Sequence, residues 1–245
     1  MKSQYLSTYY GTVLALLEQI LESERDVIVR AGCVLADTIQ QDGLIHVFGC
    51  GHSHMVCEEL FYRAGGLACI DPIFEQSVML HDGAYKSSHI ERMADYAADV
   101  VSRYPIEAGD TFLAISTSGI NSFPIEAAET AKRQGATVVG ITSSCYETET
   151  SRDKQGRHLK DVCDFWIDNH VPHGDAAVCL QDETKAGPVS SICSFFIANA
   201  VILEACGELE RRGLRPKVFS SGNVSGDGQH NDTLVRQYIH RIKHL

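Results

Sequence analysis

Two short turns in the sequence combine glycine with hydroxyl side chains and could together hold an anion. The first is GCGHSH at residues 49–54, and the second is STSGINS at residues 116–122. Each follows a short apolar run and leads into a helical pattern. The first N–H groups of a helix lack partners within it, and glycine lets a backbone approach a ligand closely. Either turn alone also fits a structural connection, but two such turns after parallel strands favour a phosphate site.

The first turn admits two further interpretations. It departs from the G-x-G-x-x-G dinucleotide fingerprint at the last position, His54, and only Asp71 is available to contact a ribose, so a dinucleotide site is disfavoured. His52, His54 and Glu58 offer the imidazole and carboxylate ligands that zinc takes. The residues alone leave open whether these side chains bind a metal, contact a ligand or cap a helix.

A third group of residues is acidic and rich in imidazole. It consists of Glu75, His81, Asp82, His89 and Glu91. A carboxylate can take a proton from a carbon beside a carbonyl, and an imidazole can move a hydroxyl proton. This pairing serves either the isomerisation of a sugar or the cleavage of a sugar ether, although each glutamate alone also fits a solvated surface.

A fourth group is the glycine-rich segment at residues 220–232, which precedes an amphipathic stretch at the end of the chain. The simpler interpretation is a loop that ends in an Asp232 helix cap. The sharper one is a flap that carries His230 to a site in its own chain or in a partner chain.

The elements that must position these groups follow from the pattern of apolar residues. We expect strands at residues 44–48, 67–70, 111–115, 137–141 and 162–167, with helices at 55–63, 89–104 and 126–133. Near-continuous apolar strands that alternate with helices predict a parallel sheet covered on both faces. Two helices, or one bent helix, precede it and end near residue 42.

Two segments interrupt this alternation. Residues 143–161 are almost wholly polar, which is typical of a functional or mobile connection. Residues 188–209 are apolar on all sides, which predicts a helix buried centrally or between subunits.

Composition limits the partners. The 245 residues carry a formal net charge of −11, which disfavours nucleic acid. The nine cysteines include no C-x-x-C pair, which indicates reduced thiols and a cytoplasmic protein. The N-terminus does not have the pattern of a signal peptide, and the longest apolar stretch, residues 192–206, is too short to span a bilayer, so no membrane partner is expected.

Three motifs in this order are similar to the SIS (sugar isomerase) domain of phosphosugar-binding proteins: GCGHS at 49–53, ISTSG at 115–119 and GATVVGIT at 135–142. ETKAG at 183–187 is similar to N-acetylmuramic acid 6-phosphate etherases, and residues 220–232 are similar to a sugar isomerase branch. The resemblance covers about residues 5–242. It implies a flavodoxin-like, three-layer αβα fold with a five-stranded parallel sheet, in one domain spanning 1–245. Residues 1–42 would be a helical extension and residues 215–245 a flap and helix.

The resemblance also implies site residues. It places the phosphate-binding hydroxyls at Ser53, Ser116 and Ser118, with the turn at Gly119. The family commonly has Ser or Thr two residues after this glycine, where this chain has Asn121, so either Asn121 or Ser122 would take that contact. The full expected phosphosugar-binding set is Gly51, His52, Ser53, Ser116, Thr117, Ser118, Gly119, Asn121, Ser122, Glu183 and Lys185.

The function that these residues predict is the binding of a phosphorylated sugar or amino sugar and its aldose–ketose isomerisation. Glu91 is the first candidate base and Glu75 the second, with His230, or else His81, moving the hydroxyl proton. Alternatives are an etherase of the N-acetylmuramic acid 6-phosphate type and a non-catalytic sugar-phosphate sensor. No cofactor is expected. The resemblance further implies a homodimer or homotetramer with sites built across subunits, and some related heptose-phosphate isomerases are metal-linked.

Overall fold

A five-stranded parallel sheet forms the centre of the molecule. The computed structural model describes residues 4–223 and 228–245. The strands are β1 (Ile45–Gly49), β2 (Ile70–Pro72), β3 (Thr111–Ile115), β4 (Thr137–Thr142) and β5 (Phe165–Asp168). Their order is β2-β1-β3-β4-β5, with Val47 opposite Leu113 and Leu113 opposite Val139. This is the flavodoxin-like order, so the predicted fold class is confirmed.

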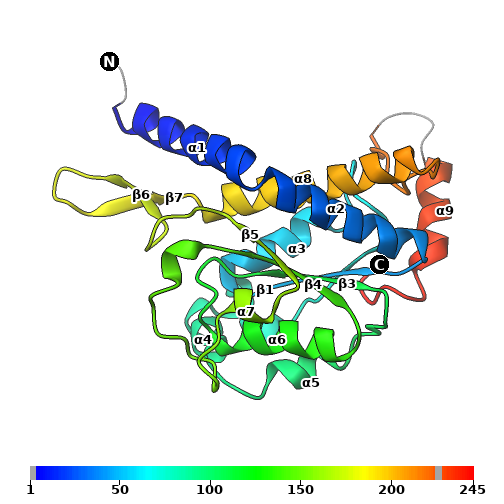
Figure 1. The fold of residues 1–245 in the computed structure, drawn as a ribbon, viewed down its shortest axis with the longest axis horizontal. Helices are drawn as coiled ribbons and strands as arrows, with labels where there is room; N and C mark the ends of the chain where they lie inside the picture. Colours follow the sequence, from blue (N-terminus) through cyan, green and yellow to red (C-terminus); the bar gives the residue numbers. More distant parts are fainter. Residues whose placement is uncertain (1–3, 224–227) are drawn as a thin grey trace.

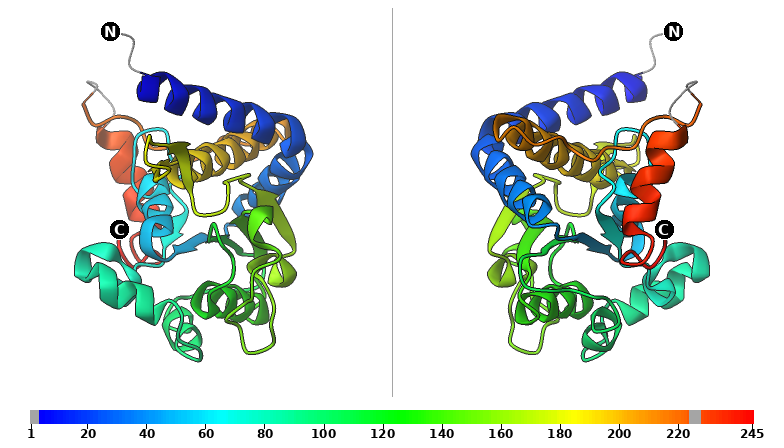
Figure 2. Two further views of the ribbon diagram at one scale, coloured as in Figure 1. Left: turned by 90° about the vertical axis from the view of Figure 1, so that its left-hand side faces the viewer. Right: turned by 90° about the vertical axis from the view of Figure 1, so that its right-hand side faces the viewer.

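Helices cover both faces of the sheet, as Figures 1 and 2 show. One layer contains α2 (Arg25–Gln40), α3 (Met55–Leu60) and α8 (Ser190–Arg211), and the other contains α4 (Ala84–Ile90), α5 (Ala97–Val101), α6 (Ser122–Arg133) and α7 (Leu159–Val162). Successive strand residues point to opposite faces, so Val47 packs in the first core and Phe48 in the second. This explains why the strands are apolar throughout.

The N-terminal segment forms two helices with a bend between them. Helix α1 (Gln4–Ser23) ends at Ser23, and α2 begins at Arg25, close to the expected break. Figure 1 shows α1 extending past the sheet towards a two-stranded antiparallel hairpin of β6 (Ala176–Cys179) and β7 (Lys185–Pro188). The hairpin was not predicted. Tyr9 anchors it by donating its hydroxyl proton to the Pro188 carbonyl at 2.6 Å.

Helix α8 is the central helix of its layer. By length and composition alone, its 22 residues could cross a membrane. The apolar stretch identified in the sequence, residues 192–206, is shorter than this helix. Cys193, Ile197 and Val201 are nonetheless fully buried inside the protein, where α8 packs against α2. The expected burial of residues 188–209, either centrally or between subunits, is therefore confirmed for this side of the helix, whereas Leu203 is 68% exposed.

Three expected elements differ in extent. The helix expected at 89–104 is two short helices, α4 and α5, with Met93 exposed between them. The strand expected at 162–167 starts with the end of α7, and β2 begins three residues later than expected. Short 3-10 turns occur at Gly51–His54 (η1), Gln76–Val78 (η2), Leu80–Asp82 (η3) and Ser144–Tyr146 (η4).

The C-terminal segment returns to the β2 edge. Val218 forms an isolated antiparallel bridge with Leu67, and α9 (Gly228–Tyr238) buries Leu234 and Tyr238. The expected terminal helix is therefore present, although Ile239 is exposed beyond its end. The middle of the expected flap, residues 224–227, lies outside the described residues.

Candidate functional site

A cavity of about 320 Å³ lies where β1 and β3 end. Open α/β sheets bind their ligands at this edge, beside the two neighbouring strands at which the strand order reverses, here β1 and β3. The lining comes from the η1 turn, the segment from η3 to the end of α4, the loop after β3, η4, the segment before β6 and the start of α8. These residues are Cys50, Gly51, His52, Ser53, Leu80, Ser87, Ser88, Glu91, Ser116, Thr117, Ser118, Tyr146, Asp175 and Ser190.

The first wall is the turn after β1. A side chain at Gly49 would bring its Cβ to 2.5 Å from the Ser53 carbonyl oxygen, so this close turn requires glycine. The turn continues as η1 before α3 begins at Met55. The Ser53 hydroxyl faces the cavity and has no hydrogen-bond partner among the described residues. It is therefore available to a ligand.

The second wall is the loop after β3. Gly119 has φ +62°, and a Cβ there would lie 2.5 Å from Thr142 Oγ1, so only glycine fits. The Gly119 N–H donates to Ser116 Oγ at 3.3 Å, and Asn169 Nδ2 donates to Thr117 Oγ1 at 3.3 Å. Within the described part of the chain the Ser118 hydroxyl has no such partner, so it is the freest donor in this loop.

Glu91 places a carboxylate in the same cavity. It directly follows α4, and a Cβ built on Gly51 would lie 3.9 Å from Glu91 Oε2. Asn121 Nδ2 donates to Glu91 Oε1, while Arg152 Nη1 donates to Asn121 Oδ1 at 2.8 Å. Desolvation raises the pKa of Glu91 above its ordinary 4.5, although the Asn121 hydrogen bond and nearby arginines oppose the shift. Such a carboxylate is suited to acid–base chemistry.

The third wall was not predicted from the sequence. Asp175, with φ +57°, accepts hydrogen bonds from the N–H of Val189 at 3.0 Å and of Ser190 at 2.8 Å, and from Ser190 Oγ at 2.6 Å. It therefore caps α8 from a position 15 residues before Ser190. In the sequence, this wall is indicated only by Ser190 at the start of a helix. Its capping partner, Asp175, comes from a distant loop and so gives no local signal.

Three residues that were predicted to bind the phosphosugar lie next to the cavity but not among its lining residues. Ser122 is buried and donates its hydroxyl proton to the Arg152 carbonyl at 2.6 Å, so its hydroxyl is already used. Gly119 forms the turn, and Asn121 reaches the cavity only through Glu91. Of the two side chains expected to share one contact, Asn121 is thus nearer to the cavity chemistry than Ser122.

The other predicted residues lie outside this cavity in the described chain. Glu75 accepts hydrogen bonds at 3.2 Å from both the Ser77 N–H and the Tyr96 hydroxyl. His230 donates from Nε2 to the Val218 carbonyl at 2.9 Å, next to the β2 edge. Glu183 lies in the turn of the β6–β7 hairpin, and Lys185 lines a separate hollow beside α1. These four residues lie away from Glu91 because Glu75, His230 and the β6–β7 hairpin are held by three different parts of the fold.

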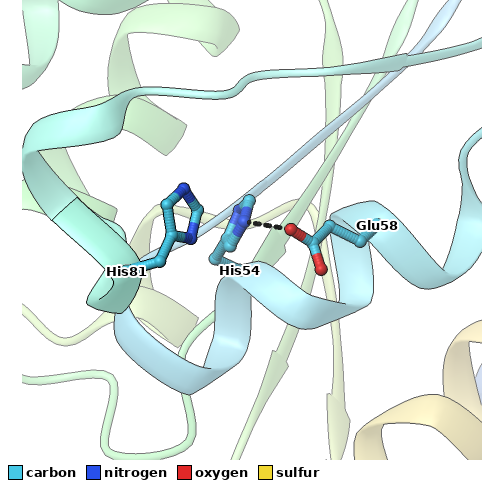
Figure 3. A group of neighbouring side chains, drawn as sticks. All are labelled: His54, Glu58 and His81. Atoms are coloured by element: carbon cyan, nitrogen blue, oxygen red, sulfur yellow. Dashed lines mark hydrogen bonds and ion pairs between the residues drawn. The ribbon is translucent and has the colours of Figure 1, made fainter.

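His81 lies with His54 and Glu58, as Figure 3 shows, and their neighbours Ser53 and Leu80 line the cavity. His54 Nε2 is 2.9 Å from Glu58 Oε1, and the His54 and His81 ring centroids are 5.9 Å apart. Burial lowers the pKa of His54 despite the Glu58 hydrogen bond. The sequence left open whether His52, His54 and Glu58 bind a metal; in the structure His52 lines the cavity, and His81 lies beside His54 and Glu58.

Known proteins are similar to this chain in fold and in the part of the sequence that contains the two turns. The SIS domain family matches residues 8–143, which contain both walls that carry the serines. The chain belongs to the SIS domain family. A UPF0309 protein of Listeria innocua is 41% identical over 97% of this chain and 97% of its own length. The chain is therefore also a member of the UPF0309 family.

Solved structures share the fold of this SIS domain protein at low sequence identity. A phosphoheptose isomerase from Francisella tularensis has a TM-score of 0.54 at 16% identity, covering 82% of this chain and 96% of its own. The Vibrio vulnificus NanR protein complexed with ManNAc-6P has a TM-score of 0.51 at 16% identity, covering 98% of this chain and 69% of its own.

Proposed function

We propose that this protein binds a phosphorylated sugar in the cavity and catalyses its aldose–ketose isomerisation. The observation that carries the proposal is that one cavity contains the desolvated carboxylate of Glu91 together with the hydroxyls of Ser53 and Ser118, which have no hydrogen-bond partner among the described residues. A volume of about 320 Å³ suits a small ligand, since ligand sites start at about 300 Å³.

The serine-lined side of the cavity is the end that receives the phosphate. Its donors are hydroxyls and loop N–H groups, and no lysine or arginine is among the described lining residues. Neutral donors of this kind form a nest for an anion. Glu91 and Asp175 would repel a phosphate placed beside them, which orients the sugar end of the ligand towards the carboxylates.

Glu91 is the base in this proposal. Its carboxylate takes the proton from the carbon beside the carbonyl, and the resulting enediol accepts that proton on the neighbouring carbon. A second group must move the proton between the two oxygens, and His52, which lines the cavity, is the imidazole available within the chain. His230 would reach this cavity only from a second copy of the chain, because its own chain holds it at Val218.

The names of the similar proteins support this class of ligand. One is a phosphoheptose isomerase, and another was solved with ManNAc-6P. We further propose that the protein acts in the cytoplasm as a homodimer or homotetramer, without a nucleic-acid partner.

A ligand screen followed by NMR tests the proposal. Aldose and ketose phosphates, each with its unphosphorylated sugar, would be screened by thermal shift, where a ligand at 100 times its Kd adds about 2.7 kcal/mol. Binders would then be followed in deuterated solvent for both isomer formation and proton exchange, because a proton carried internally exchanges slowly. Equal binding of the unphosphorylated sugars would contradict the phosphate assignment.

The same screen separates the alternatives. Cleavage of N-acetylmuramic acid 6-phosphate without isomerisation of other binders would favour an etherase. Binding of sugar phosphates with neither exchange nor conversion would make the protein a sensor.

A further inference from the structure

Three side chains beside the cavity have the types and the spacing of metal ligands. His54 comes from η1, Glu58 from α3 and His81 from η3, and one ligand atom of each lies within 4.8 Å of the others. Figure 3 shows the imidazole of His54 between the other two side chains. The residues are close in space although η3 is separated from α3 by β2 and η2.

The ligand set selects the class of metal. Two imidazoles and one carboxylate suit zinc, whose ligand distances of about 2.0–2.2 Å put tetrahedral ligand atoms about 3.3 Å apart. The His54 Nε2–Glu58 Oε1 distance of 2.9 Å is already close to this value. His81 is exposed and can rotate inward without repacking the core. Only a small movement of one side chain therefore separates this arrangement from a coordination site.

The two ring nitrogens of His54 lie in different surroundings. The residue is 4% exposed, and its Nδ1 is buried with no hydrogen-bond partner in the described part of the chain. A neutral imidazole has one N–H and one lone pair, and the contact with Glu58 uses only one of the two nitrogens. Nε2 is therefore the nitrogen that can share an ion with Glu58, and Nδ1, which points elsewhere, would carry the N–H of the metal-bound imidazole.

We infer that His54, Glu58 and His81 bind a divalent transition metal of the zinc class. Glu58 and His81 are exposed, so the fourth position faces solvent and is open to water or a ligand. The ion joins η3 to α3, and the neighbours Leu80 and Ser53 line the cavity. Metal binding would thus fix the cavity wall that contains Leu80. The inference does not require the proposed isomerase, because binding of the ion needs no sugar.

Zinc binding to the isolated protein tests the inference directly. The background would be the Cys145→Ser/Cys179→Ser double variant, because these two exposed thiols could bind zinc themselves. Chelator-treated protein would be titrated with Zn²⁺ by calorimetry and, after dialysis, measured by elemental analysis. Co²⁺ substitution would report tetrahedral geometry by visible absorption. We expect one ion per chain.

Matched variants identify the ligands. Glu58→Gln and His81→Ala should each weaken Zn²⁺ binding by at least about tenfold, since even outer-shell changes cost 10–100-fold. Both side chains are exposed, so folding should be retained, which circular dichroism would verify. Glu59→Gln on the same helix and His52→Ala at the sequence-suggested position are the controls and should bind as the background does.

Three results would overturn the inference. One is the absence of stoichiometric Zn²⁺ binding to the folded background protein. Another is unchanged affinity in both Glu58→Gln and His81→Ala. Loss in His52→Ala with His81→Ala unaffected would assign the ion to the His52 grouping and would equally refute this site.

Discussion

The Asn121 side-chain amide donates a hydrogen bond to the Glu91 carboxylate and connects it to Arg152. Asn121 opens α6 from the phosphate-side loop, whereas Glu91 follows α4 on the opposite wall. The pair therefore ties the proposed base to the loop that would hold the phosphate. A shift in either element would change the distance between the two ends of a bound sugar.

The first prediction concerns the base itself. Glu91→Gln keeps the size and the Asn121 contact but cannot accept a proton. Sugar-phosphate binding should survive, while turnover should fall by about 10²–10⁴. Glu75→Gln is the matched comparison, because Glu75 is bonded to Tyr96 outside the cavity and its loss should change turnover much less. Equal turnover of Glu91→Gln and the unmodified protein on an identified substrate would refute the role of Glu91.

The second prediction is the pH dependence of the reaction. Burial raises the pKa of Glu91, and the base must be ionised, so kcat/KM should fall as pH falls through this raised value. The Asn121 hydrogen bond lowers the pKa. Asn121→Ala should therefore move the acidic limb of the profile to higher pH. Asn199→Ala, whose amide contacts Glu59 on the far side of α3, should leave that limb in place. An acidic limb that does not move in Asn121→Ala would contradict the assignment.

The third prediction concerns the phosphate end. Ser118→Ala removes a hydroxyl that has no partner within the described residues, so the loop should keep its structure. Affinity for a sugar phosphate should fall by about 1.5–3 kcal/mol, the range for hydrogen bonds to charged groups. Ser122→Ala removes a hydroxyl bonded to the Arg152 carbonyl and should lower stability more than affinity. Calorimetric titration and urea unfolding of both variants distinguish the two effects. The reverse ranking would move the phosphate contact to Ser122.

The fourth prediction is a subunit interface on α1. Tyr10, Leu14 and Leu21 are 66%, 42% and 49% exposed and recur at helical spacing along one stripe. An exposed apolar stripe of this length is typical of an interaction surface. Light scattering should show a dimer or tetramer at micromolar concentration, and Leu14→Glu should dissociate it. Glu22→Gln on the same helix is the control. A stable monomer would contradict the prediction.

The strands and the two serine turns could be predicted because their signals are local. Val47 and Phe48 had to be apolar for opposite cores, and Gly119 had to be glycine because of its left-handed backbone. Ser53 and Ser118 lie in the turns that directly follow these strands, so their place at the cavity could be predicted as well. The flavodoxin-like order of the strands was implied by the resemblance to the SIS domain, whereas the apolar pattern alone predicted only a parallel sheet.

Features that depend on distant contacts could not be predicted. Asp175 reaches the cavity because it caps α8 across a loop, and the β6–β7 hairpin is held by Tyr9 on α1. His81 replaces His52 beside His54 because η3 folds back onto α3, which spacing along the chain does not reveal. The sequence analysis singled out all three histidines but could not show which of them lie close together in space.

The last prediction concerns a buried histidine in the sheet. His46 on β1 is fully buried, with Nδ1 2.9 Å from Asp71 Oδ2 and Nε2 3.1 Å from Asp110 Oδ2. A carboxylate on each side favours the form of the ring in which both nitrogens donate, which is the imidazolium. Burial alone would lower the pKa of His46, but the hydrogen bonds to the two aspartates outweigh it and raise the pKa above 6.5.

This raised pKa makes stability depend on pH. A raised pKa in the folded state contributes stability that is complete below about pH 6.5 and is lost as pH rises through the folded value. The pKa of Asp110 is shifted in the opposite direction, so its effect on stability has the opposite dependence on pH. Burial would raise its pKa, but bonds from His46 and from the N–H groups of Leu44 and Glu107 lower it, so its contribution is lost in acid. The free energy of unfolding should therefore decline on both sides of a mildly acidic maximum.

Urea unfolding of His46→Gln between about pH 6 and pH 8 measures how stability declines on the basic side of this maximum. Ordinary thiols ionise only above this range, so they do not contribute to the decline. The substitution leaves two buried carboxylates without their cation, so it should cost about 3–5 kcal/mol at pH 6. The cost should shrink towards pH 8, because the unmodified protein is then losing the same stabilisation. His89→Gln, on the exposed side of α4, should show neither effect. A cost for His46→Gln that is independent of pH would mean that the ring is neutral in the folded protein.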